Sequence, residues 1–293
     1  MTLRGSLLDP EFLRELEALR RRLEIDARSG HAGERAARKR GGSAEFQEHR
    51  PYADGDDPRR IDWLAYARTG TPVIKVFRTE EDVVVRAMVD VSASMGHGAP
   101  QKLEVAKKLA AAMAYMALAS SERAQLVAAG SGIAALPAPT RGRAGLVPFL
   151  RELEKLAPDG STDLAQSIEQ LRKRNLRPGL LALFSDFFDP GPVLDALARA
   201  RAQGHDVRLV QILAPDELEP NVEGDYALED VETGELVDIT LDPSAFEAYA
   251  RRLAGLFEEL RSSAKRLGAG YVLARTDEPL EAVVRRIVAG RVD

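Results

Sequence analysis

From residue 83 onward, short apolar runs alternate with longer segments that have helical spacing, and this alternation constrains the fold most. Runs such as LLALFS are apolar at nearly every position, so we expect both faces of the strands they form to be buried. Buried strands that alternate with helices form a mainly parallel sheet with helices on both faces. The sequence therefore predicts a doubly wound α/β fold.

The expected elements can be placed by their residue ranges. Strands are predicted at 83–90, 123–129, 132–136, 179–186 and 206–213, and in GYVLA near the C-terminus. Helices are predicted at 101–119, 143–156, 162–174, 191–203 and 243–267, with one more after GYVLA. An acidic, turn-rich segment at about 216–242 interrupts the pattern and indicates an inserted β-hairpin around the turn Thr233–Gly234.

Residues 1–82 do not follow this alternation and form two attachments. Residues 1–43 contain an amphipathic helix at 10–28 and a basic, glycine-containing loop. Residues 44–82 contain a helix that is capped by Asp57 and ended by Gly70, followed by a strand in TPVIKVFRTE. We expect this second segment to pack on the main domain, residues 83–293, because its strand needs a sheet partner and Trp63 needs a pocket.

Composition limits the functions open to the chain. The 41 basic and 46 acidic residues leave a net charge of −5, which gives no general attraction to nucleic acid or to an anionic membrane. The basic run RAARKR is a local exception, but no nucleic-acid recognition motif accompanies it. The absence of cysteine excludes disulfides and thiolate chemistry. No signal peptide or membrane-spanning stretch is found, so the sequence predicts a cytoplasmic protein.

Polar residues gather where the predicted strands end, which is where ligands bind in open α/β sheets. Asp90, Ser92 and Ser94 follow the first buried strand, and residues i, i+2 and i+4 of an extended chain face the same way. Thr162 lies at the start of a predicted helix, and Asp186 directly follows the run LLALFS at the end of its predicted strand. These oxygen donors predict a site for Mg²⁺ or Mn²⁺. The alternative is that they only form turns and cap helices.

Two motifs carry a resemblance to known families. D-x-S-x-S at 90–94, the threonine of GSTDL and the aspartate of FSD resemble the metal-ion-dependent adhesion site of von Willebrand factor A domains. The upstream block YADGDDPRRIDWLAYARTGTPVIKVFRTE resembles, more specifically, the bacterial family called domain of unknown function 58. The resemblance covers roughly residues 45–275 and implies a von Willebrand factor A-like, Rossmann-like fold.

The resemblance also implies roles for the five site residues. Ser92 and Ser94 would bind the metal directly, and Thr162 directly or through water, while Asp90 and Asp186 would mostly hold waters. In von Willebrand factor A domains, the open metal position typically takes a carboxylate from a partner protein. Members of the bacterial family are commonly encoded beside MoxR-type AAA+ ATPases. The implied function is a non-enzymatic adaptor that binds such an ATPase or its client.

A competing hypothesis is a Mg²⁺-dependent phosphatase that uses Asp90 as its nucleophile. Such enzymes generally place an acid two residues after the nucleophile for general acid–base chemistry, and that position is Ser92 in this sequence. In addition, no lysine accompanies the later motif FSDFFDPG to neutralise phosphoryl charge. The sequence therefore favours a binding module over a hydrolase.

Overall fold

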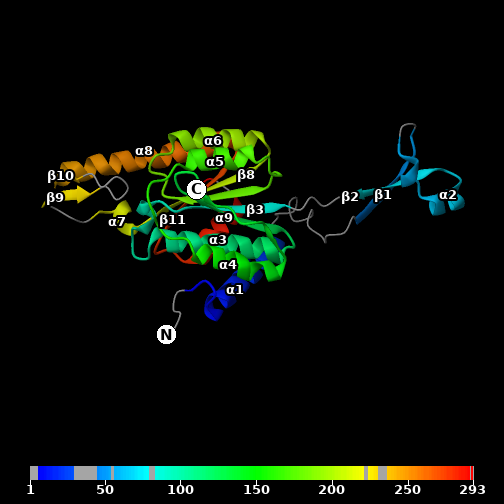
Figure 1. The fold of residues 1–293 in the computed structure, drawn as a ribbon, viewed down its shortest axis with the longest axis horizontal. Helices are drawn as coiled ribbons and strands as arrows, with labels where there is room; N and C mark the ends of the chain where they lie inside the picture. The colour runs from blue at the N-terminus through cyan, green and yellow to red at the C-terminus, as the bar shows by residue number, and fades with distance from the viewer. Residues whose placement is uncertain are drawn as a thin grey trace. The chain divides into compact units, whose positions relative to one another are not determined.

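The computed structural model describes residues 6–29, 45–53, 56–78, 83–220, 224–229, 236–290 and 292. The chain divides into two compact units, which are drawn in Figure 1. The larger unit comprises Met1–His31 and Val83–Asp293, and the smaller comprises Ala32–Asp82. The basic run at 35–40 lies outside the described residues.

A seven-stranded sheet forms the centre of the larger unit. Its strands run in the order β11-β8-β7-β3-β4-β5, and β6 also pairs with β4. Five strands are parallel, whereas β5 and β6 run antiparallel to β4. The strands are β3 (Val84–Asp90), β4 (Arg123–Ala129), β5 (Ile133–Ala135), β6 (Thr140–Arg141), β7 (Leu180–Ser185), β8 (Asp206–Leu213) and β11 (Gly270–Arg275). This confirms the predicted doubly wound, mainly parallel sheet.

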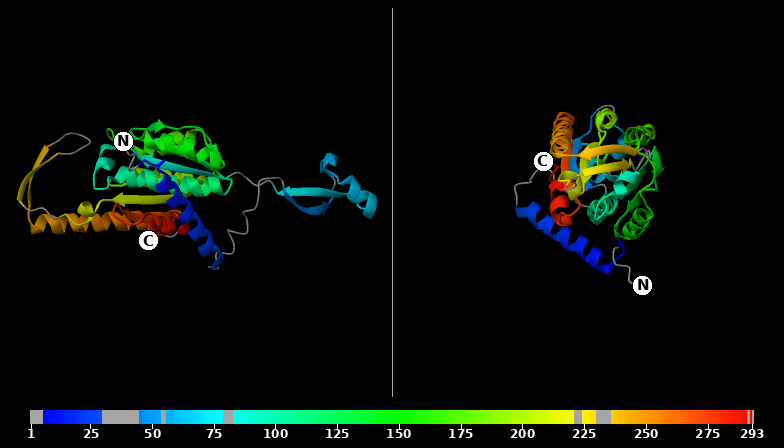
Figure 2. Two further views of the ribbon diagram at one scale, coloured as in Figure 1. Left: turned by 90° about the horizontal axis from the view of Figure 1, so that it is seen from below. Right: turned by 90° about the vertical axis from the view of Figure 1, so that its left-hand side faces the viewer.

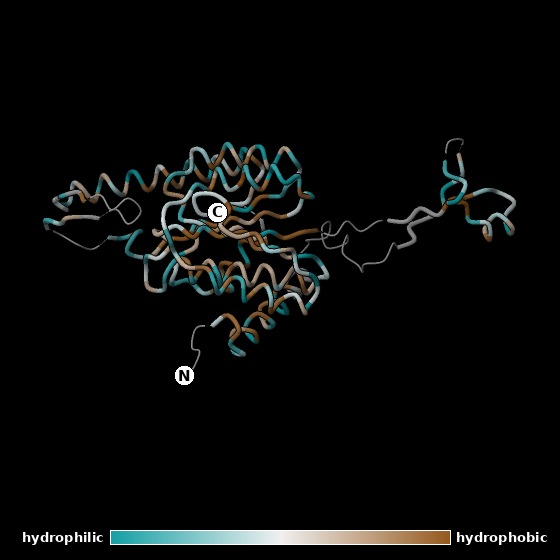
Figure 3. Tube along the Cα trace, in the orientation of Figure 1, coloured by the Kyte–Doolittle hydropathy of each residue, from teal (hydrophilic) through white to brown (hydrophobic). Residues whose placement is uncertain are grey.

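Helices cover both faces of this sheet, as Figure 1 shows. One face packs against α1 (Pro10–Ser29), α3 (Lys102–Ala119), α4 (Leu146–Glu154) and α9 (Leu280–Ala289). The other packs against α5 (Leu164–Lys173), α6 (Gly191–Ala202) and α8 (Pro243–Leu267). Successive residues of β3 alternate between the two cores, with Ala87 and Val89 in the first and Met88 in the second. Figure 3 shows the apolar character of these central strands.

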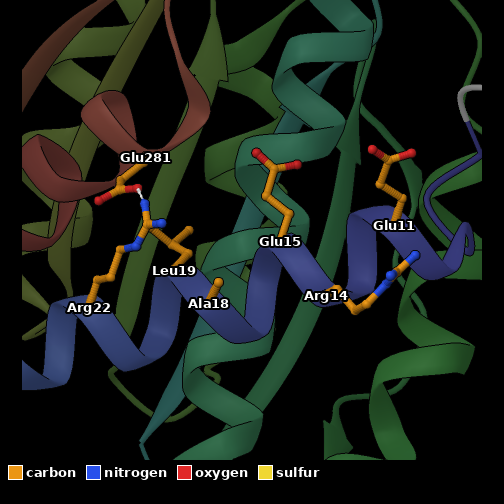
Figure 4. Close-up of a pocket in the computed structure, with 7 residues that line it drawn as sticks. All are labelled: Glu11, Arg14, Glu15, Ala18, Leu19, Arg22 and Glu281. Carbon is orange, nitrogen blue, oxygen red and sulfur yellow. Dashed lines mark hydrogen bonds and ion pairs between the residues drawn. The ribbon is translucent and has the colours of Figure 1, made fainter.

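Helix α1 belongs to the larger unit and packs on its first core. Leu16 and Leu19 are buried in the first core, and Arg22 forms an ion pair with Glu281 of α9. Figure 4 shows a shallow hollow along this helix, lined mainly by charged side chains. The hollow lies between α1 and the start of α9.

The acidic insertion forms the predicted hairpin. It begins with the short helix α7 (Pro215–Leu218) and continues as the antiparallel strands β9 (Gly224–Glu229) and β10 (Leu236–Leu241). The predicted turn at Thr233–Gly234 lies outside the described residues. Figure 2 shows the hairpin at the start of α8. No helix among the described residues is both long and apolar enough to cross a membrane.

The smaller unit contains a two-stranded sheet, β1 (Glu45–Pro51) paired with β2 (Val73–Arg78), and the helix α2 (Trp63–Thr69). The sequence predicted one helix from Asp57 to Gly70, and this is wrong in its first half. Asp57 caps a 3-10 turn, and the chain is then extended at Ile61, which forms a β-bridge with Ile74. Asp62 caps α2 by accepting hydrogen bonds from two backbone N–H groups.

Strand β1 was not predicted, and it supplies the sheet partner that β2 needs. One of the two reasons for expecting residues 44–82 to pack on the larger unit is therefore removed. The other reason was Trp63, whose side chain is 62% exposed and meets the ring of Tyr66 edge-on. Packing of this segment on the larger unit stays a prediction.

Candidate metal centre

Asp90 lies at the carboxyl end of β3, the central strand, and is fully buried. Its Oδ1 accepts a hydrogen bond from the backbone N–H of Ser92 at 2.9 Å, and its Oδ2 accepts one from the Ser185 hydroxyl at 2.7 Å. Ser185 is the last residue of the neighbouring strand β7. The carboxylate therefore ties the loop after β3 to the end of β7.

The two serines of the D-x-S-x-S motif converge as the spacing predicts. The hydroxyl oxygens of Ser92 and Ser94 are 3.1 Å apart, and the Ser94 hydroxyl donates to Asp186 Oδ2 at 2.8 Å. Asp90, Ser92, Ser94 and Asp186 are thus linked by one continuous set of hydrogen bonds. Four of the five predicted site residues are in direct contact.

Thr162 reaches the same place from another loop. It lines one groove together with Ser94 and Asp186, and its hydroxyl lies 3.5 Å from the carbonyl oxygen of Gly130, at the limit of a hydrogen bond. The loop that carries it is held against the D-x-S-x-S loop because the N–H of Ala93 donates to the carbonyl oxygen of Gly160 at 2.8 Å. All five predicted residues therefore lie at one edge of the sheet.

The capping alternative does not account for Ser92 or Thr162. Ser92 precedes a 3-10 turn, Ala93–Gly96, but its side chain makes no capping hydrogen bond to that turn. The cap of α5 is Asp163, whose carboxylate accepts from the N–H of Gln166 at 2.7 Å. The hydroxyls of Ser92 and Thr162 are therefore free of the structural role that the alternative gave them.

Lys102 is a site residue that the sequence reasoning missed. It is fully buried at the start of α3, and its Nζ donates to Asp186 Oδ2 at 2.8 Å and to Glu217 Oε1 of α7 at 2.6 Å. Its ammonium also lies 5.2 Å from the ring centroid of Phe188. No lysine lies near Asp186 in the sequence, but the fold brings the ammonium group of Lys102 into contact with it, so the expectation of a site without lysine is wrong. The available signal was its position as the first residue of the helix after the D-x-S-x-S loop.

The site holds an excess of negative charge. Asp90, Asp186 and Glu217 face one ammonium group, that of Lys102, which leaves two uncompensated negative charges when all three carboxyls are ionised. The pKa of Asp90 is raised, first by burial and also by repulsion from Asp186, while hydrogen bonds from Ser185 and Ser92 oppose the shift. Burial and the neighbouring carboxylate therefore make ionised Asp90 less stable here than in water, and a bound cation would offset this.

These features fit a small, hard divalent cation. Every candidate ligand atom is a hydroxyl or carboxylate oxygen, which is the donor type that Mg²⁺ and Mn²⁺ prefer. Among the described residues, no group of three or more His, Cys, Asp and Glu side chains is placed to hold a metal ion. The hydroxyl-based set of Ser92, Ser94 and Thr162, backed by Asp90 and Asp186, is therefore the candidate centre.

The doubly wound sheet, with a D-x-S-x-S loop after its central strand, defines an α/β domain of the von Willebrand factor A type. The chain belongs to the family described as "Protein of unknown function DUF58", whose model matches residues 48–255. This confirms the family predicted from the sequence motifs.

Similar proteins include a mycobacterial protein and several solved structures. An uncharacterized protein of Mycobacterium tuberculosis (strain ATCC 25618 / H37Rv) is 31% identical over 295 residues, covering 99% of this chain and 92% of that protein. Among solved structures, BatB from Bacteroides thetaiotaomicron has 16% identity and a TM-score of 0.43, covering 71% of this chain and 98% of that chain. The SpRpn10 VWA domain has 14% identity and a TM-score of 0.39, and the match covers 70% of this chain and 94% of that domain's chain.

Proposed function

We propose that this protein is a non-enzymatic, metal-dependent binding module whose site takes a Glu or Asp side chain of a partner protein. The observation that carries the proposal is the hydrogen-bonded set of Asp90, Ser92, Ser94 and Asp186, which gathers two carboxyl groups and two hydroxyls at the carboxyl ends of the strands. When bound, a divalent cation supplies positive charge and a coordination position for a hard anionic oxygen. The protein's own residues would orient that position toward the open edge of the sheet.

The proposed partner is a MoxR-type AAA+ ATPase or a client of that ATPase, in the cytoplasm. This part of the proposal rests on membership of the DUF58 family and on the resemblance described above. The chemistry of the site adds one requirement, which is that the partner must present a carboxylate on an accessible surface. A partner whose contact surface lacks Asp and Glu does not meet it.

The phosphatase alternative is less well supported. A nucleophilic carboxylate needs one oxygen facing the phosphorus atom, but Asp90 is fully buried and each of its oxygens already accepts a hydrogen bond. Lys102 provides a positive charge nearby, but that charge is engaged by Asp186 and Glu217. Turnover of a generic phosphoester that is lost in Asp90→Asn would favour the hydrolase instead.

Calorimetric titration with Mg²⁺ and Mn²⁺ tests the metal site. We expect weak binding by the wild type and none by the double variant Ser92→Ala/Ser94→Ala, because two of the proposed direct ligands are removed. Ser262→Ala is the control, since its exposed hydroxyl bonds only to the carbonyl oxygen of Glu259 in its own helix. Equal binding by the wild type and the double variant would rule out the site.

Co-purification with the purified ATPase tests the partner. We expect the complex to form in Mg²⁺, and to be weakened both by EDTA and by Asp90→Ala. If neither treatment changes co-purification, the site is not the contact and another surface carries the association.

A further inference from the structure

A groove of about 990 Å³ opens beside the candidate metal centre. It runs from Ser94 and Asp186 toward the first turns of α5 and α6, and its wall includes Leu164, Val193 and Phe188. Leu164 and Val193 are buried, whereas the Phe188 side chain is 45% exposed. The groove therefore presents an aromatic ring to solvent next to the proposed position of a partner's carboxylate.

The backbone holds Phe188 outward by an unusual turn. The preceding residue, Phe187, has φ +52°, in the left-handed region that bulky residues rarely adopt. Its side chain is buried, and its N–H donates at 3.1 Å to the hydroxyl of Ser185, which in turn donates to Asp90. Such backbone conformations cost roughly 1–3 kcal/mol and cluster at ligand-binding sites. The exposed ring is thus fixed by the same serine that fixes the buried carboxylate.

The ring lies at a defined distance from the site. The Lys102 Nζ is 2.8 Å from Asp186 Oδ2 and 5.2 Å from the Phe188 centroid, so the ring is at most about 8 Å from that carboxylate oxygen. Side chains two residues apart on one face of an extended peptide are separated by about 7 Å. A peptide whose carboxylate lies beside Asp186 therefore has Phe188 within reach of a side chain two residues away.

The groove is also selective for charge. Among the described residues, the ionisable side chains that line it are all acidic: Asp163, Glu169, Asp186 and Asp189. Glu169 is paired with two arginines, and Asp163 caps its own helix, which leaves exposed Asp189 as the rim charge facing an occupant. A second carboxylate on the occupant would meet repulsion outside the metal position.

We propose that this groove selects the partner by the residues that flank its metal-binding carboxylate. The occupant is an extended segment of another protein with one Asp or Glu, a bulky apolar side chain two residues away on Phe188, and Lys or Arg rather than a second acid beside Asp189. This inference rests on the proposed function, since it assumes that the carboxylate binds at the metal.

Selection from a random-peptide display library tests the inference without a known partner. The full-length protein is immobilised in Mg²⁺, and bound peptides are eluted with EDTA and sequenced. We expect enrichment of a single acidic residue with an aromatic or aliphatic residue two positions away, accompanied by Lys or Arg. The apolar preference should disappear with Phe188→Ala and persist with Tyr226→Ala, which removes a comparably exposed aromatic ring from β9. Asp189→Lys should admit a second acidic residue.

The outcomes distinguish a failure of the proposed groove from a failure of the proposed metal-dependent binding. An EDTA-eluted pool that is enriched in acidic residues, but has no apolar preference or keeps it with Phe188→Ala, overturns the groove and leaves the metal-dependent module standing. A pool without acidic enrichment, or no EDTA-dependent pool, overturns both. The wild-type pool alone decides whether an apolar preference exists, whatever the stability of the variants, and Phe188→Ala decides whether the preference belongs to that ring.

Discussion

Replacing Lys102 with methionine removes the only ammonium group in contact with Asp186 among the described residues and keeps a side chain of similar length. The lysine is fully buried, and its carboxylate partners Asp186 and Glu217 are 8% and 14% exposed. Removing one member of a buried ion pair costs about 3–5 kcal/mol, because the remaining charges stay buried without compensation. We therefore expect Lys102→Met to lower the free energy of unfolding by about that amount in EDTA.

The same substitution should strengthen cation binding. The substitution removes one positive charge from the site, and the repulsion between an ammonium group and the cation disappears. Repulsion between single charges about 4 Å apart is worth about 1–4 kcal/mol between the dielectric of water and that of a protein surface. We expect the Kd for Mg²⁺ to fall by about tenfold or more, and saturating Mg²⁺ to restore part of the lost stability.

Urea unfolding followed by far-ultraviolet circular dichroism measures both effects, because most of the described helical residues belong to the larger unit. Fluorescence does not serve, since the single tryptophan, Trp63, lies in the smaller unit. Lys107→Met is the matched control on the same helix, where the lysine pairs with the 42% exposed Glu104. Lys107 is itself only 8% exposed, but the carboxylate that its loss leaves behind stays solvated, so we expect this loss to cost about 0–1 kcal/mol. The reasoning would be refuted if both substitutions lowered the free energy of unfolding equally, or if Mg²⁺ stabilised both variants equally.

Three further predictions concern the rest of the chain. Burial lowers the pKa of His205 below its ordinary value of about 6.5, so the unfolded chain binds the proton more readily than the folded one. The free energy of unfolding should therefore fall as pH drops below that value, by at most about 1.4 kcal/mol per pH unit. Urea unfolding between pH 8 and pH 5 should show a weaker dependence of this free energy on pH for His205→Asn. Gly255→Ala should stabilise helix α8 by about 0.5–1 kcal/mol, because its added Cβ meets open space. Gly179→Ala should be strongly destabilising, because its Cβ would lie 2.2 Å from a carbonyl oxygen of β3. Thermal melts that rank the two variants in the opposite order would contradict this. Limited proteolysis should cut first within 29–43, and early cleavage between 70 and 83 with separate melting of the fragments would disprove the packing of the smaller unit.

The parts of the fold that were predicted correctly are those with a strong local signal. The strand predicted at 83–90 and the helix predicted at 101–119 match β3 and α3 within one residue, because apolar runs and helical spacing report burial directly. Strand β1 was missed because its sequence, EFQEHRP, has little apolar character, and it is held by pairing with β2. The break in the helix predicted from Asp57 was missed because it depends on the bridge to Ile74.

The candidate site shows the same division. The D-x-S-x-S spacing within 90–94 made the convergence of Asp90, Ser92 and Ser94 predictable from an extended chain. The contacts of Lys102 join residues 84 and 115 positions apart, and no local pattern reports such a pairing. The exposed Phe188 follows Phe187, whose left-handed backbone angle is one that its residue type disfavours, so the local sequence does not indicate this turn.

Lys102 is shared between the candidate metal centre and the insertion. Its second partner, Glu217, lies on α7 just before the β9–β10 hairpin, and the backbone carbonyl oxygen of Glu217 accepts a hydrogen bond from the Tyr249 hydroxyl of α8. A force on the hairpin or on α8 that shifts Glu217 therefore changes how much of the ammonium charge remains for Asp186. Thermodynamic linkage makes this effect reciprocal. If a protein that binds the hairpin changes the affinity of the site for the cation by some factor, the cation changes the affinity of the hairpin for that protein by the same factor.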